Sequence, residues 1–121
     1  MTQELAQAFG DVLSLQVVVY IGIGVFIGYL VGALPGMNRA TAIALLLPFT
    51  YKLAPLVSIS FLIGINKGGA AGCAVSAILL NVPGEPSAVV TAIDGHQMTR
   101  QGKSRKALKI ALYASVLGDV L

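Results

Sequence analysis

Residues Val12 to Leu34 read VLSLQVVVYIGIGVFIGYLVGAL, and they lie within the longest stretch of the chain without a charged side chain. At about 1.5 Å of rise per residue, a helix of this length extends about 35 Å. The hydrocarbon core of a bilayer is about 30 Å thick, so such a helix crosses it with some tilt. The sequence therefore predicts a transmembrane helix over residues 12–34.

Glycines recur at every fourth position of this predicted helix, at Gly24, Gly28 and Gly32. Residues four apart lie on one face of a helix. Lipid tails provide no hydrophobic drive for helix association, and small residues let a second helix approach closely enough for packing contacts to supply the attraction. We therefore expect this face to pack tightly against another helix.

The composition of the whole chain is typical of a membrane protein. Of its 121 residues, 56% are hydrophobic and 11% are charged, and the mean hydropathy is +0.85. Soluble domains carry about 25% charged residues, so a water-soluble domain is not expected. The length leaves room for a single transmembrane region, residues 1–121, without a second domain.

Further apolar segments follow, and Pro-Gly pairs interrupt them. They predict helices over residues 40–50, 56–80 and 107–121, whereas Ala88 to Ile93 is only briefly apolar. The first pair, Pro35-Gly36, precedes the segment 40–50, and the second, Pro83-Gly84, follows the segment 56–80. The backbone turns or unwinds at each pair, because proline lacks an N–H and glycine admits positive φ. Apolar segments interrupted in this way are typical of discontinuous transporter helices.

The predicted fold class is therefore an all-α integral membrane protein. We expect several transmembrane helices together with half-helices that are broken or re-entrant at Pro-Gly. Pro48 leaves two alternatives for residues 40–50: a helix that continues through a kink, or a half-helix that enters the bilayer and turns back. For each Pro-Gly pair, the alternative is an ordinary turn between complete helices.

Most of the basic side chains gather in one short stretch. They are Arg100, Lys103, Arg105, Lys106 and Lys109. Short loops rich in lysine and arginine face the cytoplasm, so we expect this stretch on the cytoplasmic side and the N-terminus, which lacks bases, outside. With 7% aromatic residues and no tryptophan, the chain lacks the stacking side chains of a nucleic-acid interface, and no nucleic-acid partner is expected.

Four segments of the chain form a recognisable set. They read GALPG at 32–36, ATAIALLLP at 40–48, AILLNVPGE at 77–85 and DGHQMTRQG at 94–102. Together they resemble the N-terminal part of the large permease subunit of tripartite tricarboxylate transporters. The resemblance extends from Ile21 to Leu121, with the segments in the right order and spacing.

The resemblance implies a multi-pass permease of the bacterial inner membrane that works with a small membrane subunit and a periplasmic solute-binding protein. It implies uptake of tricarboxylates or dicarboxylates, driven by a gradient of sodium or protons and without another cofactor. Permeases of this family are several times longer, so we expect the chain to be a fragment. The alternative is a non-transporting truncated fragment or a small self-assembling membrane protein.

A carboxylate substrate needs N–H donors and positive potential in a place shielded from water, and a helix N-terminus supplies both. We expect the residues around the two Pro-Gly pairs to provide such a site. The candidate substrate-binding residues are Gly36, Asn38, Thr41, Lys67, Asn81, Gly84 and Ser87. We favour Asn81 and Ser87 among these, although both are also suited to satisfying the local backbone at a turn.

Two cations, Arg39 and Lys67, lie close to or within apolar segments. An unpaired cation inside a bilayer costs several kcal/mol, so both are expected to face protein, water or a bound anion. Lys67 is either a counter-charge for the substrate or a lysine that reaches to the membrane interface. Glu85 and Asp94 have two interpretations, as carriers of a coupling ion or proton and as loop residues at the membrane surface, and we favour the second.

Catalysis and metal binding are not indicated by the sequence. His96 lies near Asp94, but neither a third polar partner nor a nucleophile accompanies them. Cys73 is the one cysteine of the chain and is far from His96 in sequence, so no ligand cluster is visible. We therefore expect a transporter rather than an enzyme, without a metal site.

Overall fold

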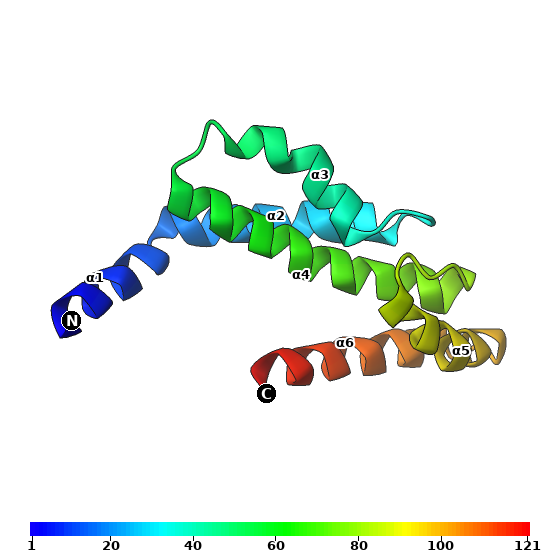
Figure 1. The fold of residues 1–121 in the computed structure, drawn as a ribbon. Helices are drawn as coiled ribbons and strands as arrows, with labels where there is room; N and C mark the ends of the chain where they lie inside the picture. Colours follow the sequence, from blue (N-terminus) through cyan, green and yellow to red (C-terminus); the bar gives the residue numbers. More distant parts are fainter.

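The computed structural model describes all 121 residues and consists of helices and their connections, with no strand. Two of the helices are long and apolar enough to cross a membrane. In chain order the helices are α1 (Thr2–Val12), α2 (Leu15–Ala33), α3 (Arg39–Thr50), α4 (Pro55–Leu80), α5 (Pro86–Arg100) and α6 (Ser104–Val120) (Figure 1). The two long apolar helices are α2 and α4.

The stretch that predicts one helix over residues 12–34 contains a helix boundary. Val12 is the last residue of α1, and α2 begins at Leu15. Ser14 lies between them with an extended backbone, at ψ 141°, as is usual for the residue that precedes a helix. The sequence shows no break here because Ser14 is uncharged, and the N-terminal helix α1 was not predicted.

Helices α2 and α4 run in the same direction with their backbones in contact. Gly24 faces Phe61, Gly28 faces Ile65 and Gly32 faces Gly69, so the residue numbers rise together along both helices. A Cβ atom on any of these three α2 glycines would come within 3.0 Å of the α4 backbone, closer than real Cβ atoms lie. The expected packing face of α2 is confirmed, since only glycine admits this approach.

Helix α4 contributes a matching row of glycines to the same interface. A Cβ atom on Gly64, Gly68 or Gly72 would likewise come within 3.0 Å of backbone oxygens of α2. The helix continues without interruption through its glycine-rich centre, because these glycines are covered by α2. We call these facing glycines of α2 and α4 the glycine interface.

Because α2 and α4 are parallel, the chain between them must run back along most of the length of α2. Helix α3 has 12 residues and covers about 18 Å of this return. It remains helical across Pro48 and ends at Thr50, after which residues 51–54 lead into α4 (Figure 1). Ala42 packs against Phe61 and Ile65 near one end of α3, and the hydroxyl of Ser58 donates to the Thr50 carbonyl at the other.

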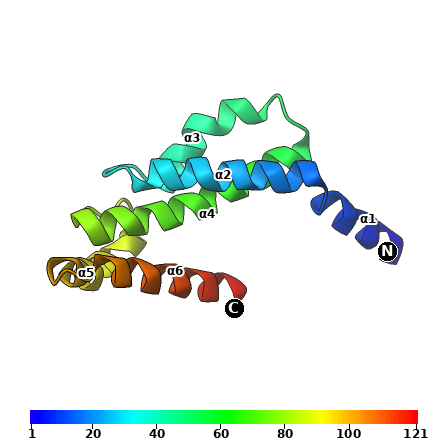
Figure 2. The ribbon, with the colours of Figure 1, turned by 180° about the vertical axis from the view of Figure 1, so that it is seen from behind.

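The chain then reverses at the end of α4 and forms two more helices. Helix α5, which was not predicted, packs Ala88 and Ala92 against Cys73 and Ala77 of α4. Helix α6 returns along α4 in the opposite direction. The α5–α6 connection, with its basic residues, lies at the opposite end of the molecule from α1 (Figure 2). This arrangement is compatible with the predicted placement of these two regions on opposite sides of the membrane.

Candidate functional site

The first Pro-Gly pair leads directly into the start of α3. Gly36 has a φ of 85°, a conformation that strongly favours glycine. Asn38 follows as the N-cap of α3, and its Oδ1 atom accepts hydrogen bonds from the Thr41 backbone N–H at 2.9 Å and the Thr41 hydroxyl at 3.0 Å. Both polar side chains therefore fix the position at which the helix begins.

The second Pro-Gly pair folds back toward the first. Asn81 ends α4 in the left-handed conformation, at φ 56° and ψ 33°. The chain then returns alongside α4, so that a Cβ atom on Gly84 would lie 2.5 Å from the Met37 carbonyl oxygen and 3.2 Å from the Cys73 sulfur. The two breaks are thus in contact, although 48 positions separate them in the sequence.

An ion pair joins the two helix starts. The Nε atom of Arg39, the first residue of α3, lies 2.8 Å from Oε2 of Glu85, the N-cap of α5. The Glu85 side chain is 11% exposed and the Arg39 side chain 41% exposed. The Ser87 hydroxyl donates to the other carboxylate oxygen, Oε1 of Glu85, at 2.7 Å.

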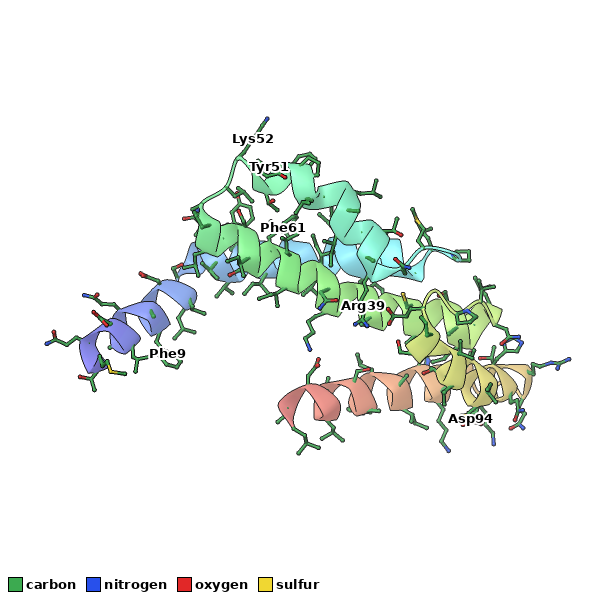
Figure 3. All side chains as sticks on the ribbon, viewed as in Figure 1. Phe9, Arg39, Tyr51, Lys52, Phe61 and Asp94 are labelled. Atoms are coloured by element: carbon green, nitrogen blue, oxygen red, sulfur yellow. The ribbon has the colours of Figure 1, made fainter.

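Helix α4 makes room for this ion pair with another glycine. A Cβ atom on Gly69 would lie 2.7 Å from the Arg39 Cβ, so only a glycine at this position lets α3 begin so close to α4. Arg39 lies where the first turn of α3 approaches α4 (Figure 3). We call the contacting residues Met37, Arg39, Cys73, Gly84 and Glu85 the Pro-Gly junction.

The Pro-Gly junction lies within the length of α4. Gly69 and Cys73 precede the end of α4 at Leu80 by two to three turns, which is about 10 to 16 Å along the helix axis. The N-termini of α3 and α5 therefore meet beside the body of a candidate membrane-spanning helix. Helix N-termini carry partial positive charge and unpaired N–H groups, and they attract anions.

The seven residues predicted for the site fall into two groups. Gly84 belongs to the Pro-Gly junction, and Ser87 is attached to it through the bond to Glu85. Asn38 and Thr41 flank Arg39 in the first turn of α3. The structure does not bring the others there: Gly36 is exposed, Asn81 is exposed at the end of α4, and Lys67 is on the side of α4 that faces α6.

Both cations pair with carboxylates, which confirms the expectation that they face protein, water or an anion. The Lys67 ammonium group contacts a carboxylate oxygen of Asp119 in α6. Glu85 lies in the loop between α4 and α5, as interpreted, and is the residue that precedes α5. The interpretation of Asp94 as a loop residue was wrong, because Asp94 is exposed within α5 (Figure 3).

The site predicted from the sequence did not include Cys73, and the pairing of Arg39 with Glu85 was not predicted. One signal for the ion pair was present: a cation follows the first Pro-Gly pair and an anion follows the second. Opposite charges next to two similar breaks in an apolar chain indicate that the breaks come together, because each charge needs a partner in the bilayer.

Two grooves lie elsewhere on the molecule. One, of about 490 Å³, runs between α4 and α6 and includes Arg105 and Lys109, and the other, of about 440 Å³, is lined by α4, α5 and α6. Both are lined mainly by apolar side chains. No residue of the Pro-Gly junction lines either groove, so the junction is a separate feature.

Comparison with known proteins gives two matches. The sequence model of the Tripartite tricarboxylate transporter TctA family matches residues 18–121. An "Uncharacterized 52.8 kDa protein in TAR-I ttuC' 3'region" from Agrobacterium vitis is 43% identical over 112 residues, which are 93% of this chain and 22% of the relative. The chain thus spans about a fifth of the length of that relative. No solved structure matches.

Proposed function

Because this chain belongs to the Tripartite tricarboxylate transporter TctA family, we propose that it contributes to a permease that takes up small organic anions. The expected substrates are tricarboxylates and dicarboxylates. The family identifies a component of a membrane transporter, and membership favours transport over catalysis. Our proposal adds two statements to the family assignment: the class of the substrate and the place where it binds.

The site in this proposal is the Pro-Gly junction with its flanking polar residues. The single observation that carries it is the meeting of two helix N-termini beside Gly69 and Cys73 of α4, with a guanidinium between them. N–H groups and dipoles from α3 and α5 supply positive potential, and Arg39 supplies a planar donor that suits a carboxylate. Asn38, Thr41 and Ser87 add neutral hydrogen-bonding groups close by.

The remaining parts of the proposal follow from the family. The permease would be a multi-pass protein of the bacterial inner membrane, with residues 100–109 facing the cytoplasm. A periplasmic solute-binding protein would deliver the substrate, a small membrane subunit would complete the assembly, and a gradient of sodium or protons would drive uptake.

The test is uptake by the full-length permease that contains this segment, produced together with its small membrane subunit and solute-binding protein. Labelled citrate and labelled succinate represent the two substrate classes. Replacing Gly84 by alanine pushes the two breaks apart, since the new Cβ meets the Met37 carbonyl oxygen. We expect G84A to lose at least about tenfold in apparent affinity for the transported anion, equivalent to about 1.4 kcal/mol.

The matched control is Gly22→Ala, because a Cβ atom at Gly22 in α2 meets nothing within 4 Å. This variant should transport with unchanged affinity. If the assembly takes up neither anion, the proposed substrate class is wrong. If G84A and G22A transport equally well, the Pro-Gly junction is not the binding site.

A further inference from the structure

The Arg39–Glu85 pair occupies the position at which the proposed function places a substrate carboxylate. Glu85 already presents a carboxylate to the Arg39 guanidinium, at 2.8 Å. A substrate carboxylate has the same chemistry as this side chain and needs the same partner. Substrate and Glu85 therefore cannot both use that face of Arg39.

We infer that the substrate binds by replacing Glu85 on Arg39, and that the released Glu85 carboxylate then takes up the coupling cation. This inference rests on the proposed function. It assigns three roles within the same site: Arg39 holds the anion, Glu85 pairs with Arg39 while the site is empty, and Glu85 binds the sodium ion or proton once the anion has entered.

The different exposure of the two partners supports the exchange. Arg39 is 41% exposed, whereas Glu85 is 11% exposed. An entering anion therefore reaches the guanidinium from its open side while the ion pair is still intact. The guanidinium changes partners without at any time being left unpaired, which would be costly in a bilayer.

The surroundings of Glu85 explain why its release calls for a cation. The charged or titratable groups that face it are Arg39 of α3 and the Cys73 thiol of α4, and on its own element the Ser87 hydroxyl donates to it. No second base forms an ion pair with it. A buried carboxylate that loses its only cation is strongly destabilised, so it becomes neutral by binding a proton or acquires a sodium ion. Charge balances at the exchange itself: one substrate carboxylate replaces the Glu85 carboxylate on Arg39, and one monovalent cation compensates the Glu85 carboxylate released. Further carboxylates of the substrate take no part in this exchange.

The experiment measures succinate binding to the purified full-length permease in detergent, at mildly alkaline pH where both succinate carboxyls are ionised. Binding is measured by calorimetry over a range of sodium concentrations and, at each, in buffers with different ionisation enthalpies. The wild-type protein should take up about one sodium ion or one proton per succinate bound. In Glu85→Gln, which cannot pair fully with Arg39, succinate should bind about tenfold more tightly, or about 1.4 kcal/mol. Its binding should take up no cation.

The control variant is Asp94→Asn, which removes an exposed carboxylate of the same helix outside the Pro-Gly junction. It should keep the affinity and the cation uptake of the wild type. Arg39→Gln should abolish succinate binding.

The outcomes separate the inference from the proposed function. If the wild type binds succinate without taking up a cation, the inference is overturned even where E85Q does not fold. If E85Q binds no more tightly than the wild type, or still takes up a cation, the inference is also overturned, and the proposed site remains. If the wild type binds neither succinate nor citrate, the proposed function itself fails.

Discussion

The glycine interface and the Pro-Gly junction are both built where the chain comes unusually close to itself, yet they are held together in different ways. In the glycine interface, two continuous helices touch through backbone atoms, and no charged side chain takes part. In the Pro-Gly junction, two interrupted segments meet, and an ion pair links them. The first contact depends on shape alone, and the second depends on shape together with charge.

This difference indicates which contact is fixed and which one can change. Parallel helices in backbone contact along several turns have no alternative arrangement of equal quality, because a small displacement brings carbonyls against Cα atoms. The Pro-Gly junction has close glycine contacts too, at Gly69 and Gly84, but its ion pair can exchange one carboxylate for another. We therefore expect the pair α2–α4 to act as a rigid support, and binding to take place at the junction.

The largest effect is expected for Gly68→Ala. The new Cβ would collide with the Val25 carbonyl of α2, at a place where neither helix can move aside. Overpacking of this kind costs about 3 kcal/mol, which outweighs the gain of about 1 kcal/mol in helix propensity. Thermal unfolding of the full-length protein in detergent should show a clear loss of stability for G68A and no loss of stability for Gly22→Ala.

A smaller loss is expected when one partner of the ion pair is removed. Arg39→Gln leaves the mostly buried Glu85 without a cation, and we expect a loss of about 2 kcal/mol, limited by the partial exposure of Arg39. Glu85→Gln in the same background should recover most of the loss in thermal unfolding. Additive losses in the double variant would show that the two residues do not interact in the native state.

Asn38→Ala should cost about 1 kcal/mol, because it removes the side chain that caps α3. Asn38→Ser should retain most of this stability. Ser14 provides a matched comparison: it is the N-cap of α2 but makes no capping hydrogen bond through its side chain, so Ser14→Ala should have almost no effect. Equal losses for N38A and S14A in thermal unfolding would contradict the role of the Asn38 cap.

The smallest effect is expected for Lys67→Met. The Lys67–Asp119 pair is about half exposed on both sides, and exposed pairs contribute about 1 kcal/mol or less. Since Lys67 lies away from the Pro-Gly junction, succinate affinity should stay within about twofold of the wild type. A large loss of affinity in K67M would instead restore Lys67 as the counter-charge of the substrate.

The sequence located the main helices through their uncharged runs and prolines, and it identified the packing face of α2 through Gly24, Gly28 and Gly32. These features depend on local composition or on a helical repeat. The helix boundary at Ser14 and the helix α5 were not predicted from the sequence. The reason is that α1 and α5 mix polar with apolar residues and are not continuous apolar runs.

The candidate site was predictable only in part. Gly84 was chosen because it belongs to a Pro-Gly pair, and Asn38 because it follows one, and the structure places both at or beside the Pro-Gly junction. Asn81 was favoured, yet it has the left-handed conformation that commonly ends a helix. The contact of Arg39 with Glu85 depends on how far the chain folds back after α4, and no local pattern fixes that distance.

The return path through α3 has a consequence for how the protein is made. A segment of 12 residues that begins with an arginine is a poor candidate for independent insertion by the translocon. Helix α3 packs on Phe61 and Ile65 of α4, and this contact forms only once α4 has emerged from the ribosome. We therefore expect α3 to adopt its final orientation late, after synthesis of α4. The correct topology of α3 then depends on α4, which holds it in place and follows it in the sequence.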